Sequence, residues 1–66
     1  MEITSNFYMR DVYTAYLGKR VILSMVGNVI AKGTLEDFSS AVIHLTFGDA
    51  HFYVPYDKVV MLTGDL

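Results

Sequence analysis

Of all residues in this chain, the two histidines, His44 and His51, can take the widest range of chemical roles. His51 follows Asp49 closely, and a His/Asp pair is typical of a general base or of part of a metal site. No third ligand and no candidate nucleophile lies near His51 in the sequence, which favours an ordinary surface turn. Glu36 and Asp37 are adjacent, so in a strand their carboxylates point to opposite faces and form a poor catalytic pair. These residues predict no metal site.

Sequence motifs for catalysis are absent. The chain contains no phosphate loop, no nucleophile elbow and no HExxH motif. It has no cysteine, which excludes disulfides and thiolate metal sites. A chain of 66 residues also offers little volume for a pocket that excludes water. We therefore expect neither enzymatic activity nor a bound cofactor.

The charge of the chain limits how it can bind nucleic acid. The net charge is −2 and the sequence pI is about 5.4. Proteins that hold nucleic acid mainly through phosphate contacts usually carry an excess of basic residues. Any basic patch on this protein must therefore be local.

The hydropathy of the sequence predicts a protein of the cytoplasm with no membrane partner. No apolar stretch approaches the roughly 18 residues that are needed to span a bilayer. Residues Met1 to Met9 are polar and aromatic, and they lack the basic region and the small-residue cleavage site of a signal peptide.

The composition is apolar for so short a chain, with 53% hydrophobic and 18% charged residues. A domain of about 60 residues buries only about 60% of the surface that its unfolded chain exposes, so it is marginally stable alone. Small domains gain stability from disulfides, metals or partner subunits. Since the sequence predicts neither of the first two, we expect part of the apolar surface to lie in an interface between subunits.

The hydrophobic periodicity predicts one helix followed by five short strands in a single domain. The helix is expected at about residues 5–17, with Thr4 or Ser5 as its N-cap and Gly18 at its end. The strands are expected at about residues 21–26, 29–38, 42–47, 50–54 and 58–62.

The turns between these strands are brief. Gly27-Asn28 predicts a two-residue hairpin turn. Gly33 interrupts the second strand, which indicates a bend, a bulge or a close approach of two backbones. An antiparallel meander with a strongly bent second strand closes most easily into a small barrel of the Sm-like or SH3-like type. The predicted fold class is therefore mainly β.

The last two predicted strands are apolar on both faces, and their only charge is Lys58 at the start of the fifth strand. An apolar strand at a sheet edge invites pairing with another chain. We expect strands 50–54 and 58–62 to pair between identical subunits. Head-to-tail pairing of this kind gives a ring if the rotation closes.

The layout of the chain resembles the Sm/LSm family, including its Hfq-like members. Val21 to Asn28 resembles the first strand and turn of the family, Gly33-Thr34-Leu35 its bent Gly-x-Leu segment, and Phe38 the apolar residue before the next loop. Val54 to Val59 has the layout of the second family motif. The resemblance implies a homo-oligomeric ring of roughly five to seven subunits that binds RNA or single-stranded DNA.

In such a ring the loop after the second strand and the loop before the fifth would meet near the pore. Tyr56 would stack on a base, which is worth about 1–3 kcal/mol, and Lys58 would neutralise a phosphate. Ser39 and Ser40 would hydrogen-bond to base edges or phosphate, with His44 facing the pore beside them. In the competing interpretation, Tyr56 packs against a neighbouring subunit, Lys58 is solvated, the serines form a turn and His44 is half-buried against the backbone.

Lys19 and Arg20 follow the predicted helix. In a ring they would form a basic rim for RNA. The alternative, which we favour, is that they interact with the negative end of the helix dipole.

A second hypothesis is a structural or protein-interaction ring without nucleic-acid binding. The acidic pI favours it, and so do three departures from the family pattern. Ser39 stands at the family's loop aspartate, Ile43 at its base-reading asparagine and Pro55-Tyr56 at its Arg-Gly pair. A third hypothesis is an unrelated SH3-like barrel that binds peptides as a monomer.

Overall fold

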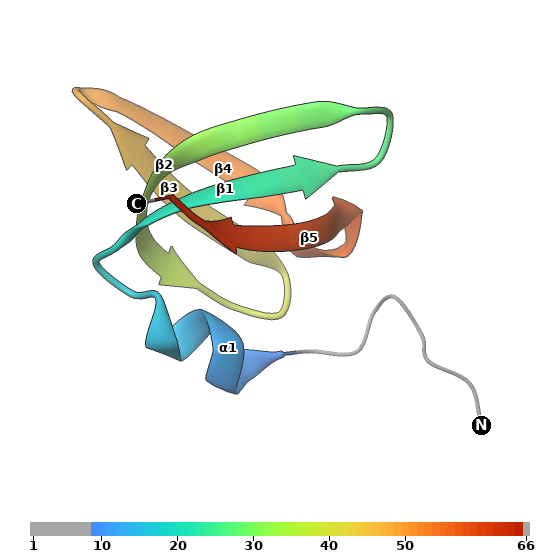
Figure 1. Cartoon of the computed structure of the whole chain (residues 1–66), viewed down its shortest axis with the longest axis horizontal. Coiled ribbons are helices and arrows are strands. Elements are labelled where there is room, and N and C mark those ends of the chain that lie inside the picture. The colour runs from blue at the N-terminus through green and yellow to red at the C-terminus, as the bar shows by residue number, and fades with distance from the viewer. Residues whose placement is uncertain (1–8, 66) are drawn as a thin grey trace.

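The computed structural model describes residues 9–65, which form one short helix and one sheet (Figure 1). Helix α1 covers Arg10–Ala15, and the strands are β1 (Arg20–Met25), β2 (Val29–Phe38), β3 (Val42–Phe47), β4 (Ala50–Pro55) and β5 (Val59–Gly64). A 3-10 turn, η1 (Tyr56–Lys58), joins β4 to β5. The predicted fold class, a helix followed by five antiparallel strands, is confirmed. No helix within these residues is long and apolar enough to cross a membrane.

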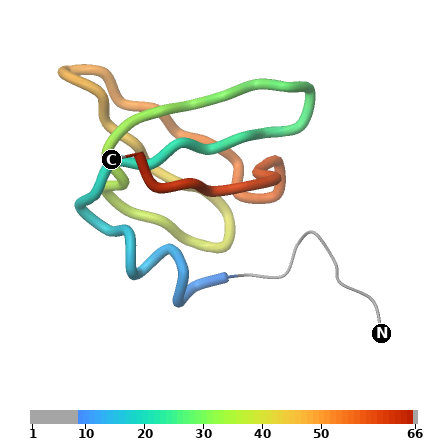
Figure 2. Tube along the Cα trace, in the orientation of Figure 1, coloured from blue at the N-terminus to red at the C-terminus, as the bar shows by residue number. Residues whose placement is uncertain are grey.

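The five strands form one curled sheet in the order β4-β3-β2-β1-β5, and every pairing is antiparallel. Strand β2 is the longest, and it pairs with β1 through its first part and with β3 through its second. Figure 2 shows that the end of β5 returns beside the start of β1, where Gly64 pairs with Val21. Strands β4 and β5 are therefore the two edges of the sheet.

The inner face of the sheet holds the core. In β1 and β3 alternate residues point inward, as the period of two requires, so that Val21 and Leu23 of β1 are fully buried. The helix adds Tyr13, whose ring lies 5.6 Å from that of Phe38 and 5.4 Å from that of Tyr56. The buried core consists of Tyr13, Val21, Leu23, Leu35, Ile43, Leu45, Val54 and Tyr56.

Helix α1 ends at Ala15, two residues earlier than the sequence predicts, and residues 5–8 of the predicted helix lie outside the described residues. Its N-cap position is Met9, and the predicted caps Thr4 and Ser5 lie outside the described residues. The chain leaves the helix through a tight turn, and Gly18 adopts a left-handed φ of +80°. The Gly18 N–H then donates to the carbonyl of Leu35, which ties the end of the helix to β2.

Gly33 lies where β2 passes close to β3. A Cβ atom at this position would stand 2.6 Å from the backbone oxygen of Thr46. Side-chain carbons do not approach a backbone oxygen so closely, so only glycine fits here. The close backbone approach, one of the alternatives that the sequence left open, is the reason for this glycine.

The turn between β1 and β2 is one residue longer than predicted. Met25 pairs with Val29, which leaves Val26, Gly27 and Asn28 in the turn. Gly27 and Asn28 both have positive φ, at +82° and +62°. Val26 does not pair with β2, and its N–H donates instead to the Lys58 carbonyl at 3.0 Å. That bond links the β1–β2 turn to the start of β5.

Candidate nucleic-acid interface

The β2–β3 turn and the β4–β5 connection, which the family resemblance places together, are neighbours in the structure. The Tyr56 N–H donates to the Ala41 carbonyl at 3.0 Å, which places the β2–β3 turn against η1. The Ser39 hydroxyl accepts hydrogen bonds from the N–H groups of Ala41 and Val42, so Ser39 is occupied in shaping the turn. Ser40 and Lys58 are exposed. Of the four loop residues predicted to bind nucleic acid, these two remain open to a ligand.

Tyr56, the predicted stacking residue, is part of the core of its own subunit. Its exposed fraction is only 7%, and its ring packs against Tyr13. The Tyr56 hydroxyl accepts a hydrogen bond of 2.9 Å from the Met9 N–H at the start of α1. The ring therefore offers no face to a base or to a neighbouring subunit. The prediction of base stacking by Tyr56 is wrong, because η1 turns the side chain inward.

The bond from Met9 to Tyr56 gives a first testable prediction. Replacing Tyr56 with phenylalanine keeps the ring but removes the acceptor of the Met9 N–H, which should cost about 1 kcal/mol of unfolding free energy. In a domain this small, we expect the melting temperature to fall by about 4–8 °C. The exposed Tyr53 provides the control, because Tyr53→Phe should leave the melting temperature unchanged in calorimetry. Equal melting temperatures for both variants would contradict this role of Tyr56.

His44 contacts another histidine rather than the loops or the backbone. It is half-buried on the outer face of β3, and its Nε2 lies 2.8 Å from His51 Nδ1. The Tyr53 ring stacks on it with centroids 4.7 Å apart and planes 15° from parallel. The sequence associated His51 with Asp49 instead, because a contact between neighbouring strands is not visible in residue order.

Lys19 and Arg20 do not act at the end of the helix. The last turn of α1 contains no basic residue, and Arg20 is already the first residue of β1. The Arg20 guanidinium lies 3.2 Å from the carboxylate of Asp65, at the end of β5. The favoured helix-dipole interpretation is therefore wrong, because the helix ends at Ala15. An exposed ion pair of this kind contributes little to stability.

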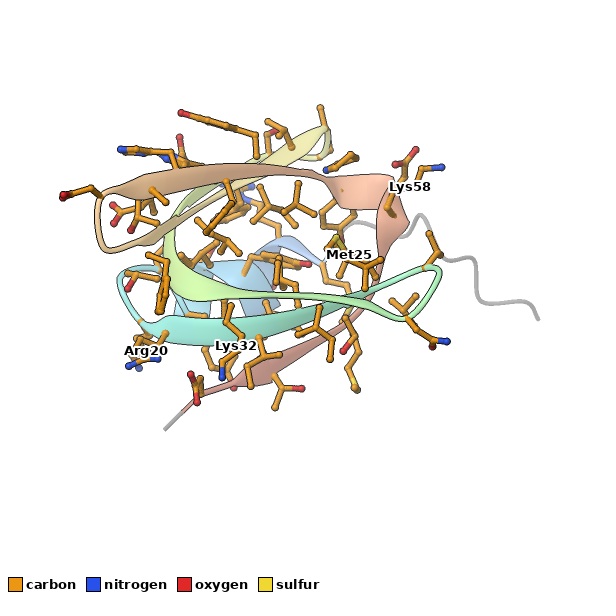
Figure 3. The ribbon with its side chains drawn as sticks, turned by 90° about the horizontal axis from the view of Figure 1, so that it is seen from above. Arg20, Met25, Lys32 and Lys58 are labelled. Atoms are coloured by element: carbon orange, nitrogen blue, oxygen red, sulfur yellow. The ribbon has the colours of Figure 1, made fainter. Side chains whose placement is uncertain are left out.

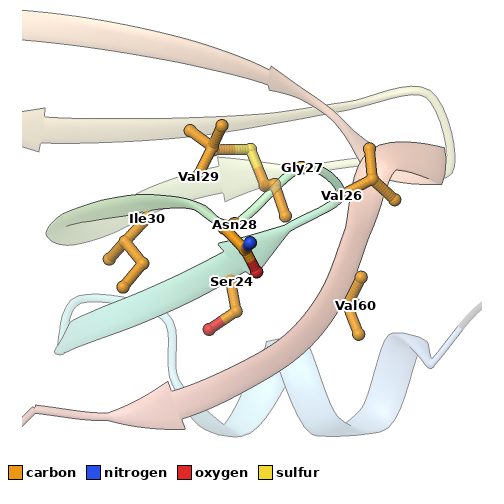
Figure 4. Close-up of a pocket in the computed structure, with 8 residues that line it drawn as sticks. Ser24, Val26, Gly27, Asn28, Val29, Ile30 and Val60 are labelled. Carbon is orange, nitrogen blue, oxygen red and sulfur yellow. The ribbon is translucent and has the colours of Figure 1, made fainter.

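A pocket that the sequence did not reveal lies between the β1–β2 turn and β5. It has a volume of about 330 Å³ and is lined by residues 24–30 and Val60. Figure 4 shows the polar side chains of Ser24 and Asn28 between Ile30 and Val60. Its lining combines apolar side chains with the hydroxyl of Ser24 and the amide of Asn28. The wall from β5 comes from 30 residues further along the chain, so sequence spacing could not indicate it.

Two basic residues lie on the same outer face of the sheet. Arg20 pairs with Thr34 and Ile22 pairs with Lys32, which makes Arg20 and Lys32 diagonal neighbours across β1 and β2. Figure 3 shows both side chains on one side of the ribbon. Lys32 is exposed, and Asp65 partly offsets Arg20. Lys32 and Arg20 are thus the basic residues that this part of the outer face presents.

Comparison with known proteins supports the fold. No family model matches the sequence, and no curated protein matches it. Among solved structures, the chain is similar to a crystal structure of the pleiotropic translational regulator Hfq, with a TM-score of 0.80 and 12% sequence identity. The match covers 97% of this chain and 100% of that one. The likeness shows that the chain has an Sm-like, Hfq-like fold, and at this identity it shows the fold alone.

Proposed function

We propose that this chain assembles into a closed homo-oligomeric ring that binds single-stranded RNA. The carrying observation is that the sheet has two unpaired edges, β4 and β5, and that both are apolar. On β4 the side chains of Phe52 and Tyr53 are exposed, and on β5 those of Val60 and Met61 are exposed. Pairing β4 of one copy with β5 of the next would remove both edges, since each copy offers one of each.

The hydrogen-bonding pattern of β4 favours such pairing. Phe47 and Ala50 close the β3–β4 hairpin across a two-residue turn. In an antiparallel pair, alternate residues bond to the partner strand, so the N–H groups of Ala50, Phe52 and Val54 face β3. Those of His51 and Tyr53 then face the open edge. Pro55, which has no N–H, also falls on the edge side, where a proline is tolerated.

A groove beside β4 would receive side chains from the neighbouring copy. Its volume is about 360 Å³. It is lined mainly by apolar residues of β2 and β4, with contributions from β1 and β3: Met25, Val29, Ile30, Ala31, Lys32, Phe47, Phe52, Tyr53 and Val54. Because the groove borders the edge of β4, the occupant that we propose is the β5 segment of a second copy, with its exposed Met61.

The outer face of β1 and β2 is the surface that we propose for RNA. A base would enter the pocket between Ile30 and Val60, with hydrogen bonds from Ser24 and Asn28, and Lys32 would contact the phosphate backbone. The Ser40 and Lys58 loops give a second, smaller surface. Repetition around a ring would raise avidity without any strong single site, which fits a chain with a net charge of −2.

Native mass spectrometry of the untagged chain, with and without oligo-U or oligo-A strands, tests the proposal. We expect a closed ring that gains one strand. A ring that gains no RNA would support the assembly but refute the binding function. A monomer at micromolar concentration would refute the ring. Single-stranded DNA of matched sequence shows whether the 2′-hydroxyl contributes.

The contribution of Lys32 is a separate prediction. Fluorescence anisotropy with a labelled RNA strand should show that Lys32→Ala weakens binding for all sequences and lowers the salt dependence, because a phosphate contact is lost. Lys58→Ala, at the loop surface, is the matched control. A loss only in the Lys58 variant would move the binding surface to the loops.

The alternative of a protein-interaction ring rests on two observations. Tyr56 is buried in the core, and the Ser39 hydroxyl is occupied by its own turn. The loop surface thus offers fewer groups to nucleic acid than the sequence suggests. A ring that binds none of the strands tested would favour this alternative.

A further inference from the structure

The structure brings the only two histidines of the chain into contact. His44 pairs with Tyr53 and Thr46 pairs with His51, so the two histidines are diagonal neighbours on the outer face of the β3–β4 hairpin. The facing atoms, His44 Nε2 and His51 Nδ1, lie 2.8 Å apart. The two imidazoles therefore face each other through these two nitrogens.

The surroundings of this histidine pair hold His44 in place. Tyr53 stacks on the His44 ring almost in parallel, at 15°. The planes of the two imidazoles are 27° apart, with ring centroids separated by 5.1 Å. His51 is exposed, so its ring can turn while that of His44 stays packed.

Two carboxylates add negative charge on the same side of the sheet. A bulge interrupts the pairing of β2 with β3 between Leu35 and Asp37. Leu35 and Phe38 pack in or against the core, and the two acidic residues between them, Glu36 and Asp37, are both exposed. The expectation that their carboxylates point to opposite faces is therefore wrong, because the bulge breaks the alternation.

Each of the two carboxylates belongs to a residue that is linked to the histidine pair by a hydrogen bond or by strand register. Glu36 accepts a hydrogen bond of 2.7 Å from Thr46, which is the register partner of His51. Asp37 is the register partner of His44. A cation at the histidine pair would gain from this negative charge.

We propose that His44 and His51 bind a divalent transition-metal ion through these two nitrogens. Metal–imidazole distances are about 2.0–2.1 Å, so two nitrogens on one ion lie about 2.8–3.4 Å apart in square or tetrahedral geometry. The observed separation of 2.8 Å is at the lower end of that range. A turn of the His51 ring lets both lone pairs converge on the ion.

The other coordination positions would hold water. Within residues 9–65 no group of three or more His, Cys, Asp or Glu side chains is placed to hold a metal. The metal binds a ring nitrogen that carries a lone pair, so each neutral imidazole would keep its single N–H on the nitrogen that faces away from the ion, Nδ1 of His44 and Nε2 of His51. Among divalent ions, Cu²⁺ should bind most tightly, ahead of Ni²⁺ and Zn²⁺.

Titration of Cu²⁺ alone into the untagged full chain, by calorimetry and electron paramagnetic resonance, tests this site. We expect one copper per chain with two imidazole nitrogens in the spectrum. Because the chain has no other histidine, such a spectrum can come only from His44 and His51. His44→Ala and His51→Ala should each weaken binding by more than about tenfold, since even outer-shell partners of metal sites are worth about 10–100-fold.

The matched control is Asp49→Asn, which changes the acidic neighbour of His51 in the sequence and should leave copper affinity unchanged. Unchanged affinity in either histidine variant would overturn the site, and so would a spectrum with one imidazole or one copper per two chains. Both ligating nitrogens belong to one hairpin of one copy, so a failure of ring assembly or of RNA binding would leave the two ligands of the metal site in place.

Discussion

Replacing Tyr53 with proline should convert the proposed ring into monomers that keep the fold. The Tyr53 N–H faces the open edge of β4, and a proline ring there would remove the donor and block the approach of a neighbouring strand. Each backbone hydrogen bond contributes about 0.5–1.5 kcal/mol, and the block recurs at every interface of the ring. Size-exclusion chromatography with light scattering measures the mass, and circular dichroism reports the sheet.

Tyr53→Val is the control for this experiment, because it removes the exposed ring but keeps the N–H and a residue that favours strands. We expect the valine variant to assemble as the parent does. Assembly of the proline variant at the parent's mass would refute pairing through β4. Dissociation of both variants would instead assign the interface energy to the tyrosine ring.

Replacing Gly33 with alanine should destabilise the fold more than a glycine-to-alanine substitution at any other glycine of the sheet. The new Cβ would lie 2.6 Å from the Thr46 oxygen, 3.2 Å from its carbonyl carbon and 3.4 Å from the Leu45 Cβ. These atoms belong to the partner strand β3, so β2 and β3 must separate. Overpacking of this kind costs about 1–3 kcal/mol, and Gly33→Val should cost more.

Urea unfolding at one fixed protein concentration measures the Gly33 effect, since assembly makes apparent stability depend on concentration. The control is Gly27→Asn, because Gly27 has a φ of +82° with nothing within 4 Å of a Cβ, and asparagine tolerates that backbone region. We expect the Gly27 variant to be nearly neutral. A Gly33→Ala midpoint equal to that of the parent would refute the close approach of β2 and β3.

The sequence predicted the strands better than the helix. Strand prediction depends on a period of two, and Val21, Leu23, Ile43 and Leu45 show it within single strands. The helix prediction used the apolar spacing of Met9, Val12, Tyr13, Tyr16 and Leu17. In the structure only Tyr13 of this set is buried and Tyr16 is half-buried, because the barrel is small and the helix touches it along one short stretch.

The contact between two of the loops was predicted. The meeting of the β2–β3 turn with the β4–β5 connection followed from the family resemblance, and the Tyr56 to Ala41 bond places them together. The sequence could not predict that the Tyr56 side chain points into the core, because its orientation depends on the backbone of η1 and not on the order of residues. Phe47 likewise shares an alternation with Ile43 and Leu45 but is exposed, since the sheet extends past the core at that end.

The sequence by itself determined the mainly β fold class and the order of the elements, because these depend on local periodicity. The need for glycine at residue 33 depends on the approach of β3, so the tertiary structure decided it. Only the tertiary structure decided which strands are edges, that His44 meets His51, and that Val60 closes a pocket with the β1–β2 turn. Each of these depends on the curl and register of the sheet, which bring together residues whose spacing along the chain carries no periodic pattern.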